Sequence, residues 1–449
     1  MSIDEVRGPV LRPGDDGYDE ERSGFQALAA HRPDIVVGAL DAADVRAAVA
    51  HAVAHGLPVA VQATGHGLPV AAEGGLLIST RRMSGVRIDP AAGTARIEAG
   101  VRWSAVIEAA AAHGLAPLSG SAPSVGAVSY TLGGGIGLLA RRYGYAADQV
   151  RAVEVVTADA RLRHVTADGE PDLFWALVGG RGNFGVVTAL EIGLVPVARL
   201  YGGALHFDAG VVDGVPAAWR EWAASVPEEM TSSVALIPFP DAPQVPAELR
   251  GRTVTHVRIA YAGDPERGER LVAPLRALGP RLKDTVRDLP YTESYTVHND
   301  PQGPVATYST HTLLRELPPR AMATLTDLFA AERPVIEVRH LGGALAKPQG
   351  APNAVGGRDA EWLVGVMSRL TPGADPAPVR PLHRRVRDAL APWSTGGHAL
   401  TFLYGENATA DQVRTAYDAD DHRRLSELKA VWDPANVFRL NHNIPPAGV

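Results

Sequence analysis

The side chain best placed to do chemistry is a histidine inside a glycine-rich loop. His66 lies in the segment Thr64-Gly65-His66-Gly67, and two further runs of small residues follow at 120–137 and 179–185. Glycine lets the main chain come close to a phosphate group, whose oxygens then accept hydrogen bonds from backbone amides. Three such runs and one imidazole favour a large dinucleotide cofactor over a metal ion or a simple nucleotide.

Other chemistries have weaker support. A lone histidine is more often structural than a ligand, and no second histidine or cysteine stands at zinc-ligand spacing from His66. The motifs of serine hydrolases and P-loop NTPases are absent from the sequence. Residues 132–137 superficially resemble a Rossmann fingerprint, but residues 125–130 are too broken by glycine to form the strand that must precede it. The alternative for these glycines is a tight turn between core elements.

The composition limits the class of protein. The chain has 449 residues, 46% hydrophobic and 21% charged, which allows two or three globular domains. Its net charge of −7 and the lack of a basic run argue against nucleic acid as a partner. The absence of cysteine excludes disulfides and fits a reducing cytoplasm. No apolar run is long enough to span a membrane, and the first ten residues do not resemble a secretion signal.

A mixed set of strands and helices must position these loops. Apolar runs and helical spacing predict strands at 35–37, 57–61, 76–78, 95–99, 150–157, 162–165 and 186–194, and helices at 42–55, 103–113 and 173–177. After a shift in composition near Pro196, they predict helices 217–224, 320–331, 410–417 and 422–431 and strands 255–261, 335–341 and 399–403. We divide the chain into a loose lead-in (1–30), a cofactor-binding domain (31–198), a second domain (199–400) and a C-terminal segment (401–449).

Taken together, the motifs resemble the FAD-linked oxidases of the vanillyl-alcohol-oxidase/PCMH (VAO/PCMH) fold, in the berberine-bridge-enzyme-like branch. The matching segments are 64–67, 126–137, 142–144, 172–176, 182–188, 433–438 and 441–444. The resemblance implies an α+β fold with a two-lobed FAD-binding domain, built from the N-terminal part and the C-terminal tail. It also implies an inserted substrate domain on an antiparallel sheet, although residues 200–395 match only faintly.

The resemblance also implies how FAD is held. In this family the histidine of the first glycine loop is joined covalently to the flavin, and His66 occupies that place. Some members add a link through a cysteine where this chain has Ala122, so a single histidyl bond is implied. The implied cofactor-binding residues are Thr64, Gly65, Gly67, Ser121, Gly126, Tyr130, Gly133, Gly134, Gly137, Val187, Asn441 and Asn443. The chain departs from the family at Gln62, where arginine is usual, and in carrying Arg181 inside the third loop.

The implied reaction is the oxidation of a small organic molecule, an alcohol or an amine. Tyr404 falls where many relatives carry a tyrosine that takes a proton from the substrate as hydride leaves. Because a free tyrosine has a pKa near ~10, this role would need nearby positive charge, which Arg339 or His340 could supply in the substrate site. Strand alternation places these two side chains on opposite faces, and the sequence does not say which face lines the pocket.

The electron acceptor and the substrate stay open at this stage. Dioxygen is the expected oxidant of the flavin, giving peroxide. The alternatives are a flavin dehydrogenase with another acceptor, or a flavin-containing drug-binding or self-resistance protein with little turnover. No metal is expected, and the oligomeric state is not readable from the sequence.

Overall fold

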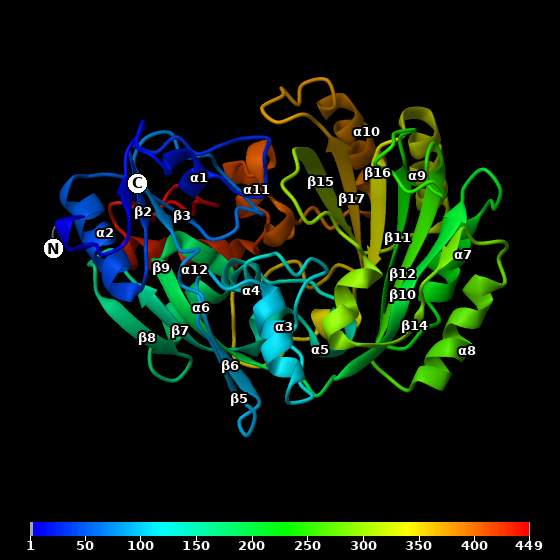
Figure 1. Ribbon diagram of the computed structural model, residues 1–449, viewed down its shortest axis with the longest axis horizontal. Coiled ribbons are helices and arrows are strands. Elements are labelled where there is room, and N and C mark those ends of the chain that lie inside the picture. Colours follow the sequence, from blue (N-terminus) through cyan, green and yellow to red (C-terminus); the bar gives the residue numbers. More distant parts are fainter. Residues whose placement is uncertain (1–2, 449) are drawn as a thin grey trace.

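The computed structural model describes residues 3–448, which form two halves that lie side by side (Figure 1). The N-terminal and C-terminal parts of the chain lie together in one half, and the green and yellow middle part forms the other. Within the described residues there are three sheets, of four, five and eight strands. Two sheets belong to the first half, and the third is the frame of the second.

The four-stranded sheet of the first half has the order β1-β2-β4-β3. Its strands are β1 (Val10–Leu11), β2 (Ile35–Gly38), β3 (Val59–Gln62) and β4 (Leu76–Ser79). Strands β2, β4 and β3 run parallel, and every residue of β2 and β4 is buried, as expected for apolar runs in a parallel sheet. Helix α2 (Ala42–Ala54) packs on this sheet, and its N-cap Asp41 accepts hydrogen bonds from two backbone amides. The sheet delivers the chain from Gln62 directly into the His66 loop.

The five-stranded sheet is antiparallel, with the order β5-β6-β9-β7-β8. Its strands are β5 (Val86–Asp89), β6 (Thr94–Glu98), β7 (Val150–Val156), β8 (Leu162–Thr166) and β9 (Val186–Gly193). The helices among and after these strands are α3 (Trp103–Ala111), α4 (Ala127–Leu132), α5 (Ala140–Tyr143) and α6 (Pro171–Gly180). The second glycine run therefore forms a short helix and tight turns between α3 and β7, not a strand.

The eight-stranded sheet of the second half follows the path β13-β10-β12-β11-β16-β17-β15, with β14 paired to β10. Its strands are β10 (Arg199–Asp208), β11 (Met230–Pro238), β12 (Thr253–Tyr261), β13 (Lys283–Asp284), β14 (Arg287–Pro290), β15 (Thr307–Leu314), β16 (Val335–His340) and β17 (Trp362–Arg369). All of its strand pairs are antiparallel. The boundary that we propose at 198/199 falls between β9 and β10.

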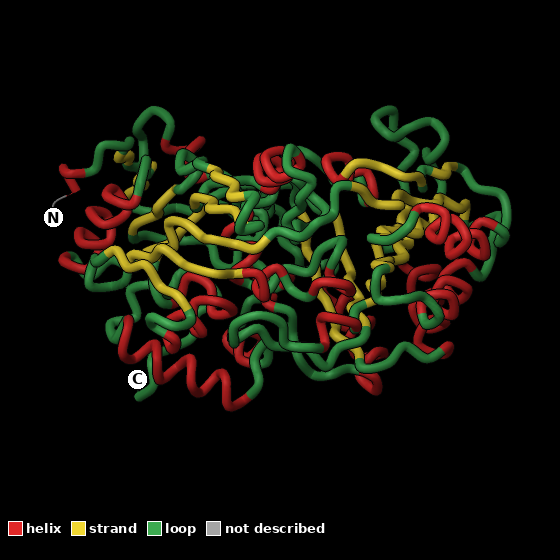
Figure 2. Tube along the Cα trace, turned by 90° about the horizontal axis from the view of Figure 1, so that it is seen from below, coloured by secondary structure: helices red, strands yellow, loops and turns green. Residues whose placement is uncertain are grey.

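The two faces of the eight-stranded sheet differ. One face carries an apolar core with the helices α7 (Val215–Ala223), α8 (Pro265–Arg276), α9 (Pro319–Glu332) and α10 (Arg380–Leu390). Figure 1 shows α7 and α8 on the side of the sheet away from the first half, and Figure 2 shows helices gathered at that end of the molecule. The other face turns toward the first half and carries polar side chains such as Arg258, Glu337 and Arg339. Period-two alternation along each strand produces this difference.

The chain returns to the first half through α11 (Ala410–Arg414) and α12 (Ala419–Trp432). Buried Lys429 of α12 is held there, since its ammonium donates to Asp433 and to the carbonyls of Asn183 and Phe438. Every predicted helix and strand named above has a counterpart, with one exception. Residues 399–403 form a 3-10 turn at Leu400–Phe402 instead of a strand, because their amides bond to carbonyls three residues earlier.

The expectation of a loose lead-in was also wrong for the part that the structure describes. Val10 and Leu11 pair with β2, and α1 (Tyr18–Arg22) packs on the four-stranded sheet through Tyr18. The backbone of residues 25–27 then bonds to the His66 loop and to residue 305 of the second half. Among residues 3–448, no helix is both long and apolar enough to cross a membrane.

Candidate active site

A cavity of about 360 Å³ lies where the two halves meet. Residues from 61–70 form one wall, residues from 120–132 with Ile136 another, and residues from 181–187 and 438–442 a third. The second half and the C-terminal segment close it with Arg339, Thr401, Phe402 and Tyr404. Segments from the whole length of the sequence thus meet in one space, and all three glycine runs contribute to it.

His66 is held in the wall of this cavity by two hydroxyl groups and one aromatic ring. Its Nδ1 lies 2.9 Å from Thr64 Oγ1 and its Nε2 lies 3.2 Å from Ser124 Oγ. The Phe25 ring stacks on the imidazole with a centroid separation of 3.8 Å and an angle of 11° between the planes. Burial lowers the pKa of His66 to about 4, and the charge of Arg102 adds to this effect. The imidazole is therefore neutral at neutral pH, with a nitrogen lone pair available.

Thr64 also joins the first two glycine runs, because Gly126 N–H donates to its hydroxyl at 3.2 Å. Residue 65 must be glycine for two reasons: its φ is +67°, and the backbone of the lead-in segment lies too close to leave room for a side chain. A Cβ on Gly65 would lie 2.6 Å from the Cα of Gly24. Gly67, in contrast, has open space where a side chain would be, and it faces the cavity.

Gly133, Gly134, Gly135 and Gly137 pack against the protein itself, whereas Gly120 and Gly126 of the same run line the cavity. A Cβ on Gly135 would lie 2.5 Å from the Tyr130 ring, and one on Gly137 would lie 2.0 Å from the Ser119 carbonyl oxygen. Gly133 is close to Arg181, and Gly134 to Val355 and Tyr145. The space that these glycines leave open is filled by side chains and main chain of the protein itself, so the cradle expected at 133, 134 and 137 is not part of the cavity wall.

Tyr130 occupies much of that space. Its ring stands edge-on to Trp103 at 5.6 Å, and its hydroxyl is buried with no hydrogen-bond partner among the described residues. Burial raises the pKa of Tyr130 far above its usual value, so the hydroxyl stays protonated. A buried hydroxyl without a partner is costly, and Tyr130 is one of the residues that line the cavity.

Two more polar groups in the wall fit a large anionic cofactor with hydrogen-bonding edges. Arg181 donates to Ser129 and contacts His442 Nδ1 at 3.2 Å, so it has no carboxylate partner among residues 3–448. Burial lowers the pKa of Arg181 only to about 10, so it remains a cation. The side-chain oxygen of Asn441 is buried without a partner, while its amide nitrogen is fixed by the carbonyls of Gly182 and Phe438. A cation, an acceptor and the Tyr130 hydroxyl suit FAD, which offers a diphosphate, an N–H edge and ribityl hydroxyls.

Tyr404 closes the cavity from the C-terminal segment. The next amide, Gly405 N–H, donates to the Leu68 carbonyl at 2.9 Å, which ties the tyrosine to the His66 loop. The Tyr404 hydroxyl lies 3.5 Å from Thr307 Oγ1 on β15. Burial raises the pKa of Tyr404, and the hydroxyls of Ser309 and Thr307 oppose that effect. The positive charge that the sequence interpretation expected beside Tyr404 is thus replaced by two hydroxyl groups.

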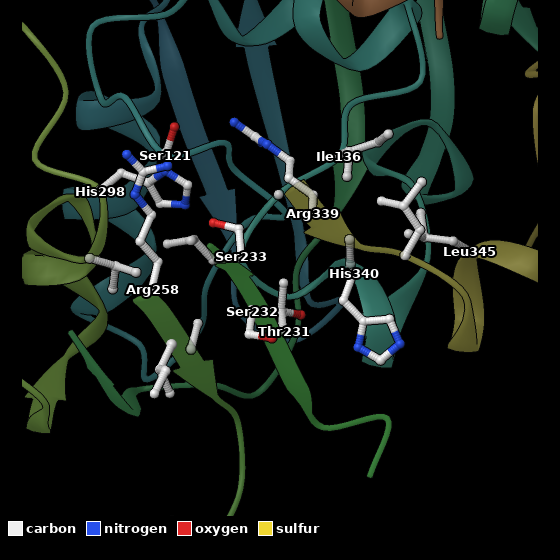
Figure 3. A pocket seen from close by; sticks show the side chains of 17 residues that line it. Ser121, Ile136, Thr231, Ser232, Ser233, Arg258, His298, Arg339, His340 and Leu345 are labelled. Atoms are coloured by element: carbon white, nitrogen blue, oxygen red, sulfur yellow. The ribbon is translucent and has the colours of Figure 1, made fainter. Parts of the chain in front are cut away.

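The two faces of strand β16 have different surroundings, and the face that carries Arg339 lines the cavity. Arg339 and Glu337 point toward the first half, and Arg339 lines the cavity. Figure 3 shows the Arg339 and His340 side chains pointing in opposite directions. His340 stacks on Trp362 at 4.5 Å on the helix-covered face, and Arg141 donates to it at 2.9 Å. His340 therefore does not line the large cavity, where the sequence interpretation expected it, although it is one of the residues around the smaller cavity described next.

Glu337 lies between two arginines. It pairs with Arg339 at 2.9 Å and makes a short contact with Arg258. These two cations hold the pKa of Glu337 well below its usual range, although burial opposes them. A smaller cavity of about 30 Å³ adjoins this cluster and is also lined by Ser121 and His298 (Figure 3). Ser121 donates to Asp300 of the second half at 2.6 Å, so it also joins the two halves.

The structure brings together most of the residues expected at the site. Those that line the large cavity are Thr64, Gly65, His66, Gly67, Ser121, Gly126, Tyr130, Val187, Arg339, Tyr404 and Asn441. Those that do not line it are Gly133, Gly134, Gly137, His340 and Asn443. Sequence reasoning missed Phe25, Ser124 and Thr307, which contact the expected residues. Ser124 lies within the second glycine-rich run, whereas Phe25 and Thr307 come from segments without a recognisable motif.

Comparison with known proteins agrees with this geometry. Residues 33–166 match the family described as FAD binding domain, and residues 404–445 match the family described as berberine and berberine like. The chain is 30% identical over 470 residues to (R)-6-hydroxynicotine oxidase of Paenarthrobacter nicotinovorans, covering 99% of this chain and 98% of that protein. FAD is therefore the cofactor, and the protein is an oxidoreductase.

Solved structures show the same fold. The berberine-bridge-enzyme-like 1 protein of Physcomitrella patens superposes with a TM-score of 0.86 at 18% identity, over 100% of this chain and 98% of the other. The carbohydrate oxidase of Microdochium nivale gives a TM-score of 0.83 at 20% identity, over 99% and 98% of the two chains. The chain belongs to the FAD-linked oxidoreductases of the VAO/PCMH fold, in the berberine-bridge-enzyme-like family.

Proposed function

We propose that this protein is an oxidase that removes hydride from a carbon bearing a hydroxyl or amino group of a small organic molecule. FAD, when bound, supplies the hydride acceptor and passes the electrons to dioxygen, which gives hydrogen peroxide. The observation that carries the proposal is the meeting of His66 and Tyr404 in one cavity wall, joined by the Gly405 to Leu68 hydrogen bond. One residue would hold the cofactor and the other would handle the substrate proton.

Tyr404 is the candidate proton acceptor. As hydride leaves the substrate carbon, the proton of the hydroxyl or amine passes to the phenolate oxygen of Tyr404, so that charge balances. Because burial raises the pKa of Tyr404, the resting form at neutral pH is the phenol, and the phenolate is a minor form. The reaction therefore depends on groups that stabilise this phenolate, and the hydroxyls of Thr307 and Ser309 are placed to do so.

His66 is the candidate attachment point for the flavin. Its lowered pKa keeps the imidazole neutral and nucleophilic, and Thr64, Ser124 and the Phe25 ring fix its orientation. Ala122 stands in the same cavity wall, so a second link through a cysteine is impossible. We therefore propose one histidyl–FAD bond.

The substrate end of the cavity favours a small molecule with little net charge. Leu68, Pro69, Val70 and Phe402 supply apolar surface beside Tyr404. Arg339 lies over the Phe402 ring at 5.2 Å, and the carboxylates of Glu337 and Asp300 offset its charge together with that of Arg258. A strongly anionic substrate would therefore find little unbalanced positive charge in this part of the described wall.

The test is anaerobic mixing of the purified holoprotein with a panel of secondary alcohols, sugars and cyclic amines, followed by admission of air. An oxidase bleaches with at least one compound and recovers its colour in air with one equivalent of peroxide. Bleaching without rapid recovery in air would instead indicate a dehydrogenase. If no compound bleached the flavin although several bound, the proposal would fail in favour of a binding protein.

A further inference from the structure

We propose that Gln26 is a positioning residue for the reaction. Its side chain orients the Thr307 hydroxyl so that this hydroxyl donates a hydrogen bond to Tyr404. The inference rests on the proposed role of Tyr404 as proton acceptor. It assigns the hydrogen bond that would stabilise the phenolate form of Tyr404. Three segments far apart in sequence carry it: the N-terminal segment, β15 and the C-terminal segment. Hydrogen bonds among Gln26, Thr307 and Tyr404 link these three segments.

The orientation of the Gln26 amide is fixed by its neighbours. Its side-chain oxygen accepts from two backbone amides, Leu28 N–H at 3.1 Å and Thr307 N–H at 3.3 Å. Backbone amides can only donate, so this atom must be the oxygen and the other must be the NH₂ group. That NH₂ group lies 3.2 Å from Thr307 Oγ1. Gln26 is also buried, with 7% of its surface exposed, so water does not compete for these bonds.

The direction of the next hydrogen bond follows. An amide NH₂ group has no acceptor capacity, so it donates to Thr307 Oγ1 and leaves the threonine proton free to point elsewhere. The oxygen of Tyr404 lies 3.5 Å away on that side, and catalytic hydrogen bonds are commonly long before the substrate binds. A donor aimed at the phenol oxygen stabilises the phenolate and lowers the pKa of Tyr404 against the effect of burial.

The backbone around Gln26 holds this arrangement in place. Gln26 N–H donates to the Gly65 carbonyl at 3.0 Å, and Phe25 N–H donates to the Thr64 carbonyl at 2.9 Å. On the other side, Ala27 N–H donates to the Val305 carbonyl at 2.8 Å, two residues before Thr307. The segment 25–27 therefore joins the His66 loop to β15, so the geometry at Tyr404 is coupled to the loop that would hold the flavin.

The charged groups near Tyr404 do not account for the opposition to the effect of burial on its pKa. Arg339, Arg181, His66 and His442 share the cavity wall with it. Glu406, two residues later, pairs with Arg380 on the exposed side. Burial raises the pKa of Tyr404, and the hydroxyls of Ser309 and Thr307 lower it.

The experiment measures the ionisation of Tyr404 in the holoprotein and needs no substrate. Phenolate absorbance in the ultraviolet is recorded against pH for each protein and for the same protein carrying Tyr404→Phe. The difference isolates Tyr404 from the other tyrosines and from the flavin. In Gln26→Glu the carboxylate accepts the Thr307 proton, so we expect the Tyr404 phenolate signal at pH ~10 to fall about tenfold or more. Thr307→Val, which deletes the hydroxyl, should lower the signal in the same direction.

The matched control is Arg81→Met. Arg81 donates to the carbonyls of Glu20, Glu21 and Ser23, so its loss loosens the same segment without touching Thr307. We expect the Tyr404 signal of this variant to equal that of the wild type. An unchanged signal in both Gln26→Glu and Thr307→Val, or an equal fall in Arg81→Met, would overturn the inference.

The titration result for Gln26 can be distinguished from a failure of the proposed function. If Tyr404→Phe reduced its flavin as fast as the wild type with a substrate from the panel, the role of Tyr404 as proton acceptor would fail, while the titration could still show the effect of Gln26. If Tyr404→Phe slowed reduction but Gln26→Glu left the ionisation unchanged, only the role of Gln26 would fail.

Discussion

Single residues at the site are best understood from the partners that they lack. Arg181 bonds to a carbonyl, a hydroxyl and an imidazole. Tyr130 and Asn441 each hold a buried oxygen that has no partner among residues 3–448. A protein that folds around a resident cofactor leaves such groups for the cofactor to satisfy. The sequence indicated Tyr130 and Asn441 through family motifs, but it could not show that Arg181 has no carboxylate nearby, since that depends on tertiary packing.

The first prediction concerns Arg181. In a His66→Ala background, where FAD binding is measured without a covalent bond, Arg181→Met should weaken FAD binding about 10- to 100-fold, because it removes a charge-assisted contact. Fluorescence titration of the apoprotein with FAD measures the dissociation constant. Arg181→Lys keeps the charge and should lose less. Equal affinities of the Met and Lys variants would contradict a role for the charge.

The second prediction concerns pH. Because the pKa of Tyr404 is raised by burial, its phenolate fraction increases about tenfold for each pH unit across the neutral range. The anaerobic rate of flavin reduction, measured by stopped flow with a neutral alcohol from the panel, should rise with the same slope. Tyr404→Phe should lose the slope and be much slower throughout. A rate that is independent of pH in the wild type would argue for a different proton acceptor.

Among the elements, β16 illustrates what periodicity can predict. Its alternation placed Glu337 and Arg339 on one face and His340 on the other, as the structure shows. The sequence could not choose the face, because both carry a cation or a potential cation and the choice depends on which side the helices cover. The prediction of a strand at 399–403 was wrong, because a short apolar run is compatible with more than one local structure. In the protein this run forms a 3-10 turn beside the cavity.

The third prediction is that Glu337→Gln destabilises the eight-stranded sheet. The substitution leaves Arg258 and Arg339 close together without their shared carboxylate. Loss of one partner from a buried ionic group typically costs about 3–5 kcal/mol. Urea unfolding of the holoprotein measures the change. Glu332→Gln, which breaks a more exposed pair with Arg385, should cost less than about 1 kcal/mol, and equal losses would contradict the burial argument.

The two halves of the molecule share one apolar cluster, which includes Trp103 of the first half and Tyr291 and Leu345 of the second. Polar contacts near the cavity also join the halves. The N-terminal segment joins both halves, although its polar, glycine-dotted sequence has no periodicity that would predict this. The two-lobed FAD-binding half was predictable, because apolar runs and family motifs mark it. The antiparallel sheet of the second half was implied only by the family resemblance, since residues 200–395 match faintly and only β12 and β16 among its eight strands were named from the sequence. The packing role of the glycines from 133 to 137 was not, because a glycine required by a neighbouring ring and one required by a phosphate look alike in sequence.

The fourth prediction is a steep loss of stability in mild acid. Burial lowers the pKa values of many histidines to about 4 or 3, including His31, His66, His206, His298, His311, His340, His383 and His442. The unfolded chain binds a proton at each of these near pH ~6.5, so the stability present above that pH is lost as pH falls toward ~4. The loss can reach about 1.4 kcal/mol per histidine per pH unit.

Thermal unfolding measured between pH 7 and pH 5 tests this prediction. The window lies above the range in which carboxylates such as Glu337 take up protons, because cations hold the pKa of that group below its usual range. We expect the melting temperature to fall progressively across the window. A constant melting temperature from pH 7 to pH 5 would mean that the buried histidines do not remain neutral in the folded protein.

The most direct measurement is to unfold the purified yellow protein in acid and to follow its colour. With the flavin bonded to His66, the visible absorbance should precipitate with the wild-type polypeptide and stay in solution for His66→Ala. A colourless wild-type protein would contradict the proposed cofactor site. A colour that separates from the wild-type chain, or that remains attached after His66→Ala, would contradict the proposed bond.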